Sequence, residues 1–167
     1  MEEQTVSFLL YIDLINDSFD WQGWYFSSKE IIQNIGYSCN YIAVASQHFH
    51  SGKVLLLRRN EKRLLNEINT GSRIDNIQLM VLPPDFNTAV FDYEVQIIKY
   101  NDFIMLTVNK HDFNKVNINM FISEMEKYIY VTYWEIFEMS RYETPLLYAA
   151  KDNPKSFFKS LKVLSTG

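Results

Sequence analysis

The chain has 167 residues and a net charge of −4, and a chain of this length is expected to fold as one domain, residues 1–167, without a metal or a disulfide to stabilise it. Its only cysteine, Cys39, excludes an internal disulfide framework and fits a reducing compartment, and the N-terminus lacks the basic region and apolar run of a signal peptide. No apolar stretch approaches the ~18 residues of a membrane span, and the negative net charge disfavours nucleic acid as a ligand. We therefore expect a cytoplasmic protein that binds neither a membrane nor nucleic acid.

The first half of the chain predicts a strand, a helix, two strands, a helix and a strand, in that order. The strands are expected at residues 7–15, 39–47, 53–58 and 74–82, and the helices at 27–35 and 60–69. Ser27 and Glu30 resemble a capping box at the start of the first helix, and Gly36 ends it. A single longer helix from Gly52 onward is an alternative to the third strand and second helix. The order is that of ferredoxin-like folds, and it implies no function by itself.

The segment 87–109 is the clearest structural signal, because apolar and polar residues alternate on both sides of Asn101-Asp102. Asn tolerates a positive φ angle, so these two residues are expected to form the turn of a β-hairpin. The turn sets the pairing of the two strands: Val95 with Val108, Ile97 with Leu106, and Lys99 with Ile104. Asp92 and Glu94 then fall on the polar face.

The last third predicts a helix at residues 115–127, a strand at 130–140, and short helices that begin at Thr144-Pro145 and Asn153-Pro154. With the elements before them, they predict an α+β fold in which helices pack on a mixed, largely antiparallel sheet. Glu135 would lie on an apolar face of the 130–140 strand. We expect it to be a buried acceptor with a hydrogen-bond partner, unless the strand assignment is wrong.

Signals for chemistry are sparse. Asp13, Asp17 and Asp20 could supply oxygen ligands to a divalent cation, as in a small metal-assisted hydrolase, but their spacing is not that of an EF-hand and a solvated acidic loop is the plainer interpretation. His48 and His50 form an H-x-H pair that His111 and Asp112 could join in a zinc site, but the chain has no Cys cluster or HExxH motif, and scattered surface histidines are the plainer interpretation. The chain also has no GxGxxG, P-loop or GxSxG motif. We therefore expect no enzyme, no metal and no cofactor. A regulatory domain with a ring-lined ligand pocket is a further alternative.

The segment 16–26 is dense in acids and large rings and is expected to be a loop. Rings flanked by acids are typical of protein-binding anchors with a charged rim, although some of these rings could instead fold back over the core. With the acids of the hairpin, the expected partner-binding residues are Asp17, Asp20, Trp21, Trp24, Tyr25, Asp92 and Glu94.

Two segments, FDWQGWYF (Phe19 to Phe26) and EIFEMSRYETPLLYAAKDNP (Glu135 to Pro154), resemble in their overall character the sequences of a known group of proteins. The chain resembles the immunity proteins encoded beside bacterial polymorphic toxins, which are small, acidic, single-domain proteins without catalytic motifs. The resemblance is one of overall character and not of diagnostic positions. It implies a protein that neutralises one cognate toxin by direct contact, with acidic side chains that complement a basic toxin domain.

Overall fold

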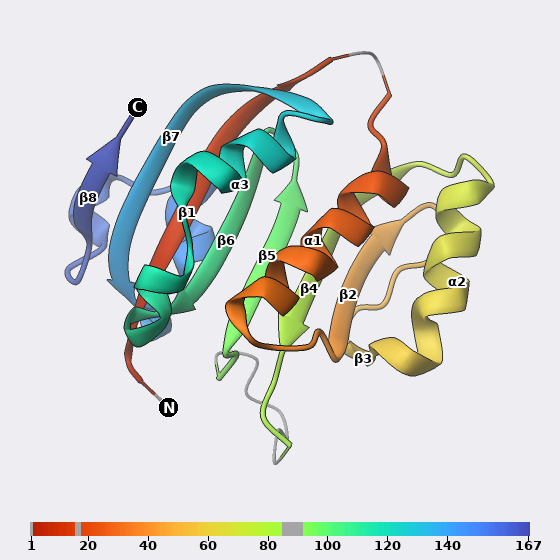
Figure 1. Cartoon of the computed structure of the whole chain (residues 1–167), viewed down its shortest axis with the longest axis horizontal. Helices are drawn as coiled ribbons and strands as arrows, with labels where there is room; N and C mark the ends of the chain where they lie inside the picture. Colours follow the sequence, from red (N-terminus) through yellow and green to blue (C-terminus); the bar gives the residue numbers. More distant parts are fainter. Residues whose placement is uncertain (1, 16–17, 85–91) are drawn as a thin grey trace.

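The fold is built on one antiparallel sheet. A computed structural model describes residues 2–15, 18–84 and 92–167, and within them the sheet has eight strands in the order β3-β2-β4-β5-β6-β1-β7-β8 (Figure 1). The strands are β1 (Gln4–Leu14), β2 (Tyr41–Ser46), β3 (Leu55–Leu56), β4 (Ile74–Val81), β5 (Val95–Tyr100), β6 (Phe103–Asn109), β7 (Ile129–Ser140) and β8 (Lys162–Thr166). The helices are α1 (Trp21–Ile35), α2 (Leu57–Asn69), α3 (Ile118–Met125) and α4 (Pro145–Ala149), with 3-10 turns η1 (Lys110–Lys115), η2 (Arg141–Glu143) and η3 (Lys155–Phe157).

The expected α+β class is confirmed, and so is the order of elements in the first half, β1-α1-β2-β3-α2-β4. The neighbours in the sheet differ from those of a ferredoxin-like fold. β1 pairs antiparallel with β6 on one side and with β7 on the other. All strand pairs among the described residues are antiparallel, so the first half forms no split βαβ unit.

An apolar layer covers each face of the sheet. Alternate residues of β1 point to opposite faces, so Phe8 and Leu10 belong to one core cluster, and Leu9 and Tyr11 to another. Helices α1, α2 and α3 contribute to the first cluster, and α1 and α3 cross that face in Figure 1. The C-terminal segment with α4 packs on the second face. This burial on both faces explains why β1 is apolar almost throughout.

β5 and β6 form the predicted hairpin in the predicted register. All three expected pairs occur, and Asn101 in the turn has a φ angle of 41°. The register follows from the alternation, because a slip of one residue would move the apolar set of one strand to the other face. Residues 87–91 of the predicted first strand lie outside the described residues, and the described strand begins at Val95.

A strand and a helix, and not one helix from Gly52, occupy the region before β4. β3 has only two residues, and α2 follows it at Leu57, three residues before the expected start. Asn60 is not the cap, since its side-chain amide donates to the Leu56 carbonyl one turn earlier at 2.8 Å. The longest described helix, α1, has 15 residues, and none of the described helices is both long enough and apolar enough to cross a bilayer.

The C-terminal segment differs from the prediction. Asn153-Pro154 leads into the 3-10 turn η3 and not into a helix. After this turn Phe158 is buried, and the chain forms β8 at the edge of the sheet beside β7. The strand predicted at 130–140 is confirmed as β7.

Candidate functional site

The segment expected to be a loop, 16–26, forms the first turns of α1 in its second half. Asp20 is the N-cap residue, and its Oδ1 accepts the backbone N–H of Gly23 at 2.9 Å. From Trp21 onward, positions 21, 24, 25, 28, 32 and 35 follow the helical period and turn toward the sheet. Ser27 therefore lies within the helix and does not cap it, and its hydroxyl donates to Glu124 at 2.9 Å.

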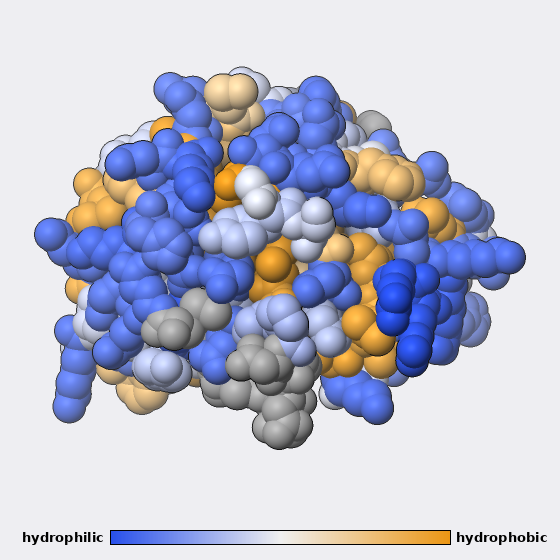
Figure 2. Space-filling view, turned by 60° about the horizontal axis from the view of Figure 1, so that its bottom comes forward, coloured by the Kyte–Doolittle hydropathy of each residue, from blue (hydrophilic) through white to orange (hydrophobic). Residues whose placement is uncertain are grey.

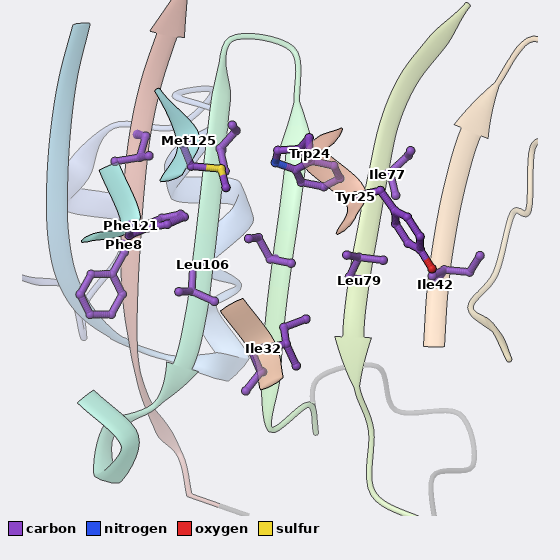
Figure 3. Close-up of a cluster of buried hydrophobic side chains, with 14 of the residues drawn as sticks. Phe8, Trp24, Tyr25, Ile32, Ile42, Ile77, Leu79, Leu106, Phe121 and Met125 are labelled. Atoms are coloured by element: carbon purple, nitrogen blue, oxygen red, sulfur yellow. The ribbon is translucent and has the colours of Figure 1, made fainter. Parts of the chain in front are cut away.

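The prediction that Trp24 and Tyr25 are exposed anchors is wrong. Both side chains are 0% exposed. Figure 3 shows both of them among the core side chains between α1 and the sheet. The helical conformation explains the difference, because it places residues 24 and 25 on the face that packs on the strands. Trp21 is half-buried, with its ring 4.9 Å from that of Phe19, and keeps part of its surface accessible.

Asp92 and Glu94, the predicted acids of the hairpin, do not come together with Trp21. The ammonium of Lys99, near the C-terminal end of β5, lies 5.6 Å from the Trp21 ring, whereas Asp92 and Glu94 precede the first residue of that strand. Both acids are half-buried, and Glu94 accepts a hydrogen bond from Asn109 at 2.7 Å. Their role in partner binding stays a prediction.

The candidate metal site also stays untested. Asp17 lies outside the described residues, Asp13 is exposed near the end of β1, and Asp20 caps α1. In the part of the chain that the structure describes, no three His, Cys, Asp or Glu side chains lie close enough together to hold an ion. His48 instead lies 3.1 Å from Glu67.

Helix α2 presents a basic outer face that the sequence interpretation did not include. Its exposed cations are Arg58, Arg59, Lys62 and Arg63. Among the described residues the first three form no ion pair, and the guanidinium of Arg63 stacks 4.0 Å from the ring centroid of Phe49. The segment 53–63 has five basic side chains and one acidic one, in a chain whose net charge is −4. A cationic patch therefore projects from an acidic molecule.

Both acids of α2 are engaged away from this face. Glu61 Oε2 accepts the Tyr25 hydroxyl at 2.5 Å and pairs with the Lys29 ammonium at 2.7 Å. The hydrogen bonds from Lys29 and from Tyr25 lower the pKa of Glu61, and burial together with the bond to this carboxylate raises the pKa of Tyr25. Glu67 is buried and lies 3.1 Å from Nδ1 of His48. The carboxylates of the helix therefore leave its outward cations unneutralised.

An open hollow lies beside the start of α2. It has a volume of about 390 Å³ and is lined by Lys29, Cys39, Asn40, Leu56, Leu57, Arg58 and Glu61. Burial raises the pKa of the Cys39 thiol to about 11, and the thiol contacts the carbonyl oxygens of Tyr41 and Met80 at 3.5 Å. A thiol held in its neutral form is a poor nucleophile, so the hollow offers shape and charge and no activated group.

The surface around α2 combines apolar and charged groups. On the face shown in Figure 2, hydrophobic surface is divided into separate areas, one of which borders strongly hydrophilic side chains on the side of the molecule that carries α2. Leu55 and Leu56, which form β3 directly before the helix, are half-buried. Apolar side chains next to arginine are typical of the centre of a protein–protein contact.

The signal for this surface was present in the sequence. In LRRNEKRLL (Leu57 to Leu65) the apolar residues recur at helical spacing with cations between them, which predicts an exposed basic face. The net charge of the whole chain, −4, does not reveal the patch, because acidic residues elsewhere outnumber its cations.

Comparisons of the chain with protein-family models, with curated proteins and with solved structures find no match. A proposal of function therefore rests on the surfaces and pockets of this chain.

Proposed function

We propose that this protein is a binding protein that acts by direct contact with one cognate protein partner, in the way that an immunity protein neutralises a toxin. The outer face of α2 forms the main contact, with Leu55 and Leu56 beside it. The observation that carries the proposal is the separation of charge on α2. Arg58, Arg59 and Lys62 are exposed and have no ion-pair partner among the described residues, while both carboxylates of the helix are engaged elsewhere.

This separation of charge does not help the helix itself. Arg58 and Lys62, like Arg59 and Arg63, are four residues apart, and like charges at this spacing destabilise a helix by ~0.2–0.5 kcal/mol per pair. A partner that supplies the opposite charges removes the repulsion and gains electrostatic steering at the same time. The arrangement is therefore better suited to binding than to folding.

The partner is expected to present carboxylates. Guanidinium groups bind carboxylates in a planar, bidentate geometry, and three of the four cations are arginines. An extended polyanion such as nucleic acid would also meet the net negative charge of the rest of the chain, whereas a protein with a local acidic patch would not. This partner differs from the basic toxin domain that the resemblance to immunity proteins implies, because a partner meets the charge of the local patch and not the net charge of the whole chain.

A charge reversal on α2 tests the proposal. The test variant carries Arg58→Glu, Arg59→Glu and Lys62→Glu, which are all exposed and outside the core. The matched control carries Lys155→Glu, Lys159→Glu and Lys162→Glu, which change the charge equally on the exposed C-terminal segment. Each protein is co-expressed with the products of the neighbouring genes, cell growth is scored, and the purified pair is measured by biolayer interferometry.

We expect the native chain and the control to protect the cells and to bind one of these products. The α2 variant should bind it about tenfold more weakly or worse, mostly through slower association at low salt. Equal binding by the α2 variant and the control would refute the assignment of this surface. Failure of the native chain to bind any neighbouring product would refute the proposed function.

A further inference from the structure

A second pocket lies on the other face of the sheet, where β1 and β7 meet the segment that follows α4. It has a volume of about 290 Å³ and is lined by Tyr11, Tyr133, Glu135, Tyr148, Lys151, Asn153 and Lys155. Three tyrosines, one buried carboxylate and two ammonium groups thus surround a space of the size of a small metabolite. The interaction surface on α2 does not include any of these residues.

The floor of the pocket is the carboxylate of Glu135, which is 4% exposed. Its Oε1 accepts the Tyr148 hydroxyl at 2.5 Å, and its Oε2 accepts the Tyr133 hydroxyl at 3.2 Å. Burial, together with the neighbouring carboxylate, raises the pKa of both hydroxyls, so they remain donors at physiological pH. Each carboxylate oxygen has a lone pair beyond the one that the tyrosine uses, so the floor can accept further hydrogen bonds.

One wall of the pocket already holds a cation. The ammonium of Lys151 lies 3.8 Å from the ring centroid of Tyr11, and this ring stacks with that of Tyr133 at 6.1 Å. An ammonium over the face of an aromatic ring is attracted by the quadrupole of the ring. The contact shows that a primary ammonium fits against this wall, and the ammonium that occupies it belongs to an exposed and movable side chain.

The mouth of the pocket has the opposite character. Lys151 and Lys155 are exposed, and in the described ranges neither forms an ion pair. Asn153 lies between them in the sequence and adds an amide to the lining. A purely cationic ligand would be repelled by the two lysines, and a purely anionic ligand would face the buried carboxylate of Glu135. A ligand with both charges, correctly spaced, meets neither penalty.

We infer that this pocket binds a small zwitterion of the α-amino acid class. The ammonium of the ligand takes the place of Lys151 against Tyr11 and Tyr133, and donates to the oxygens of Glu135. Its carboxylate is held at the mouth by Lys151 and Lys155. The ammonium of Lys151 thus exchanges its contact with the Tyr11 ring for an ion pair with the carboxylate of the ligand.

The experiment measures binding of the twenty standard amino acids to the full chain, first by thermal shift at millimolar concentration and then by calorimetry for those that stabilise it. For the best ligand, the N-acetyl derivative removes the positive charge and the amide removes the negative one. We expect stabilisation by at least one free amino acid, and at least about tenfold weaker binding of each derivative. Absence of any stabilisation, or equal binding of either derivative, would overturn the inference.

Variants of the pocket give a second, independent test. Glu135→Gln should weaken binding about tenfold or more, because the charged acceptor is lost while the shape is kept. Lys151 is exposed, so Lys151→Gln should not perturb folding. It should weaken binding roughly threefold to tenfold. Lys159→Gln, an exposed lysine outside the pocket, is the matched control and should leave the affinity unchanged. Unchanged affinity in folded Lys151→Gln would contradict the assigned role, whether or not Glu135→Gln folds.

Discussion

Lys99 places a charged group in the interior, and we predict that Lys99→Met changes how the stability of the protein depends on pH. The side chain is 4% exposed, and its strand neighbours are Ile77 and Ile104. Its ammonium donates to the carbonyl of Asn101 at 2.6 Å and lies 5.2 Å from the ring centroid of Phe19. Burial lowers the pKa of Lys99 from 10.5 to about 8, since these contacts replace the hydration of the ammonium only in part.

The sign of the effect follows from this pKa. The pKa in the folded state lies below that of the unfolded chain, so between these two values the unfolded chain holds a proton that the folded protein has lost. The free energy of unfolding therefore rises with pH across this window. The full difference between the two pKa values corresponds to ~3 kcal/mol, and the part between about pH 7 and pH 9.5 to ~2 kcal/mol.

Urea unfolding followed by tryptophan fluorescence, at a series of pH values, checks this prediction. The difference in unfolding free energy between the native chain and Lys99→Met should move by ~2 kcal/mol in favour of the native chain as pH rises from about 7 to 9.5. Other titrating groups are common to both proteins and cancel. Lys62→Met, at an exposed position, is the control and should show no such trend. A constant difference between Lys99→Met and the native chain would refute the assigned pKa.

Three further outcomes are expected. Trp24→Ala should lower the unfolding free energy by about 3–5 kcal/mol in urea titrations, and Trp24→Phe should cost clearly less, because the indole N–H has no hydrogen-bond partner among the described residues. Tyr148→Phe should cost about 1–3 kcal/mol in the same assay, since it removes the 2.5 Å hydrogen bond to the buried Glu135. Cys39 should react with a disulfide reagent far more slowly in the native protein than in urea, because a rise in pKa from 9.0 to about 11 leaves roughly a hundredfold less thiolate near neutral pH.

The hairpin could be predicted to the residue because its information is local. Alternation sets the faces, the Asn101-Asp102 turn sets the register, and the two must agree. β8 carries no comparable signal. All five of its residues are exposed, and they form a strand because β7 lies beside them. The sequence of residues 162–166 alone does not indicate this pairing.

The start of α1 was predictable in principle. Asp20 with Gly23 at N3 forms the cap, and the spacing from Trp21 to Ile35 is helical. The expectation of a loop instead followed from the many rings and acids of residues 16–26, and the helical period was not used. The fold also requires a glycine at position 23 for a reason that the sequence does not show. A Cβ atom at this position would lie 2.7 Å from the ring of Tyr128.

The candidate sites show the same division between local and distant information. Glu135 is a buried acceptor with hydrogen-bond partners, as the apolar face of its strand predicted. The pocket above it could not be predicted, because Tyr11 comes from the first strand, and Tyr148 and Lys151 from a segment that folds back across the sheet. The basic face of α2, by contrast, lies within 13 consecutive residues, and a local count of charge finds it.

The two proposed sites should act independently. α2 packs beside β2 and β3 at one edge of the sheet, whereas Glu135 lies on β7 near the other edge, and four strands separate β2 from β7. Coupling across them would need an element with two arrangements, and a sheet with apolar residues on both faces has one register, because a slip would invert every side chain. The charge reversal on α2 should therefore leave amino-acid affinity unchanged, and Lys151→Gln should leave partner affinity unchanged, each within ~0.5 kcal/mol. A larger effect of Lys151→Gln on partner affinity would mean that the partner also contacts the C-terminal segment, and partner binding would then have to be remeasured with the amino acid present. A larger effect of the α2 variant on amino-acid affinity, which is measured without the partner, would mean that the two sites are coupled.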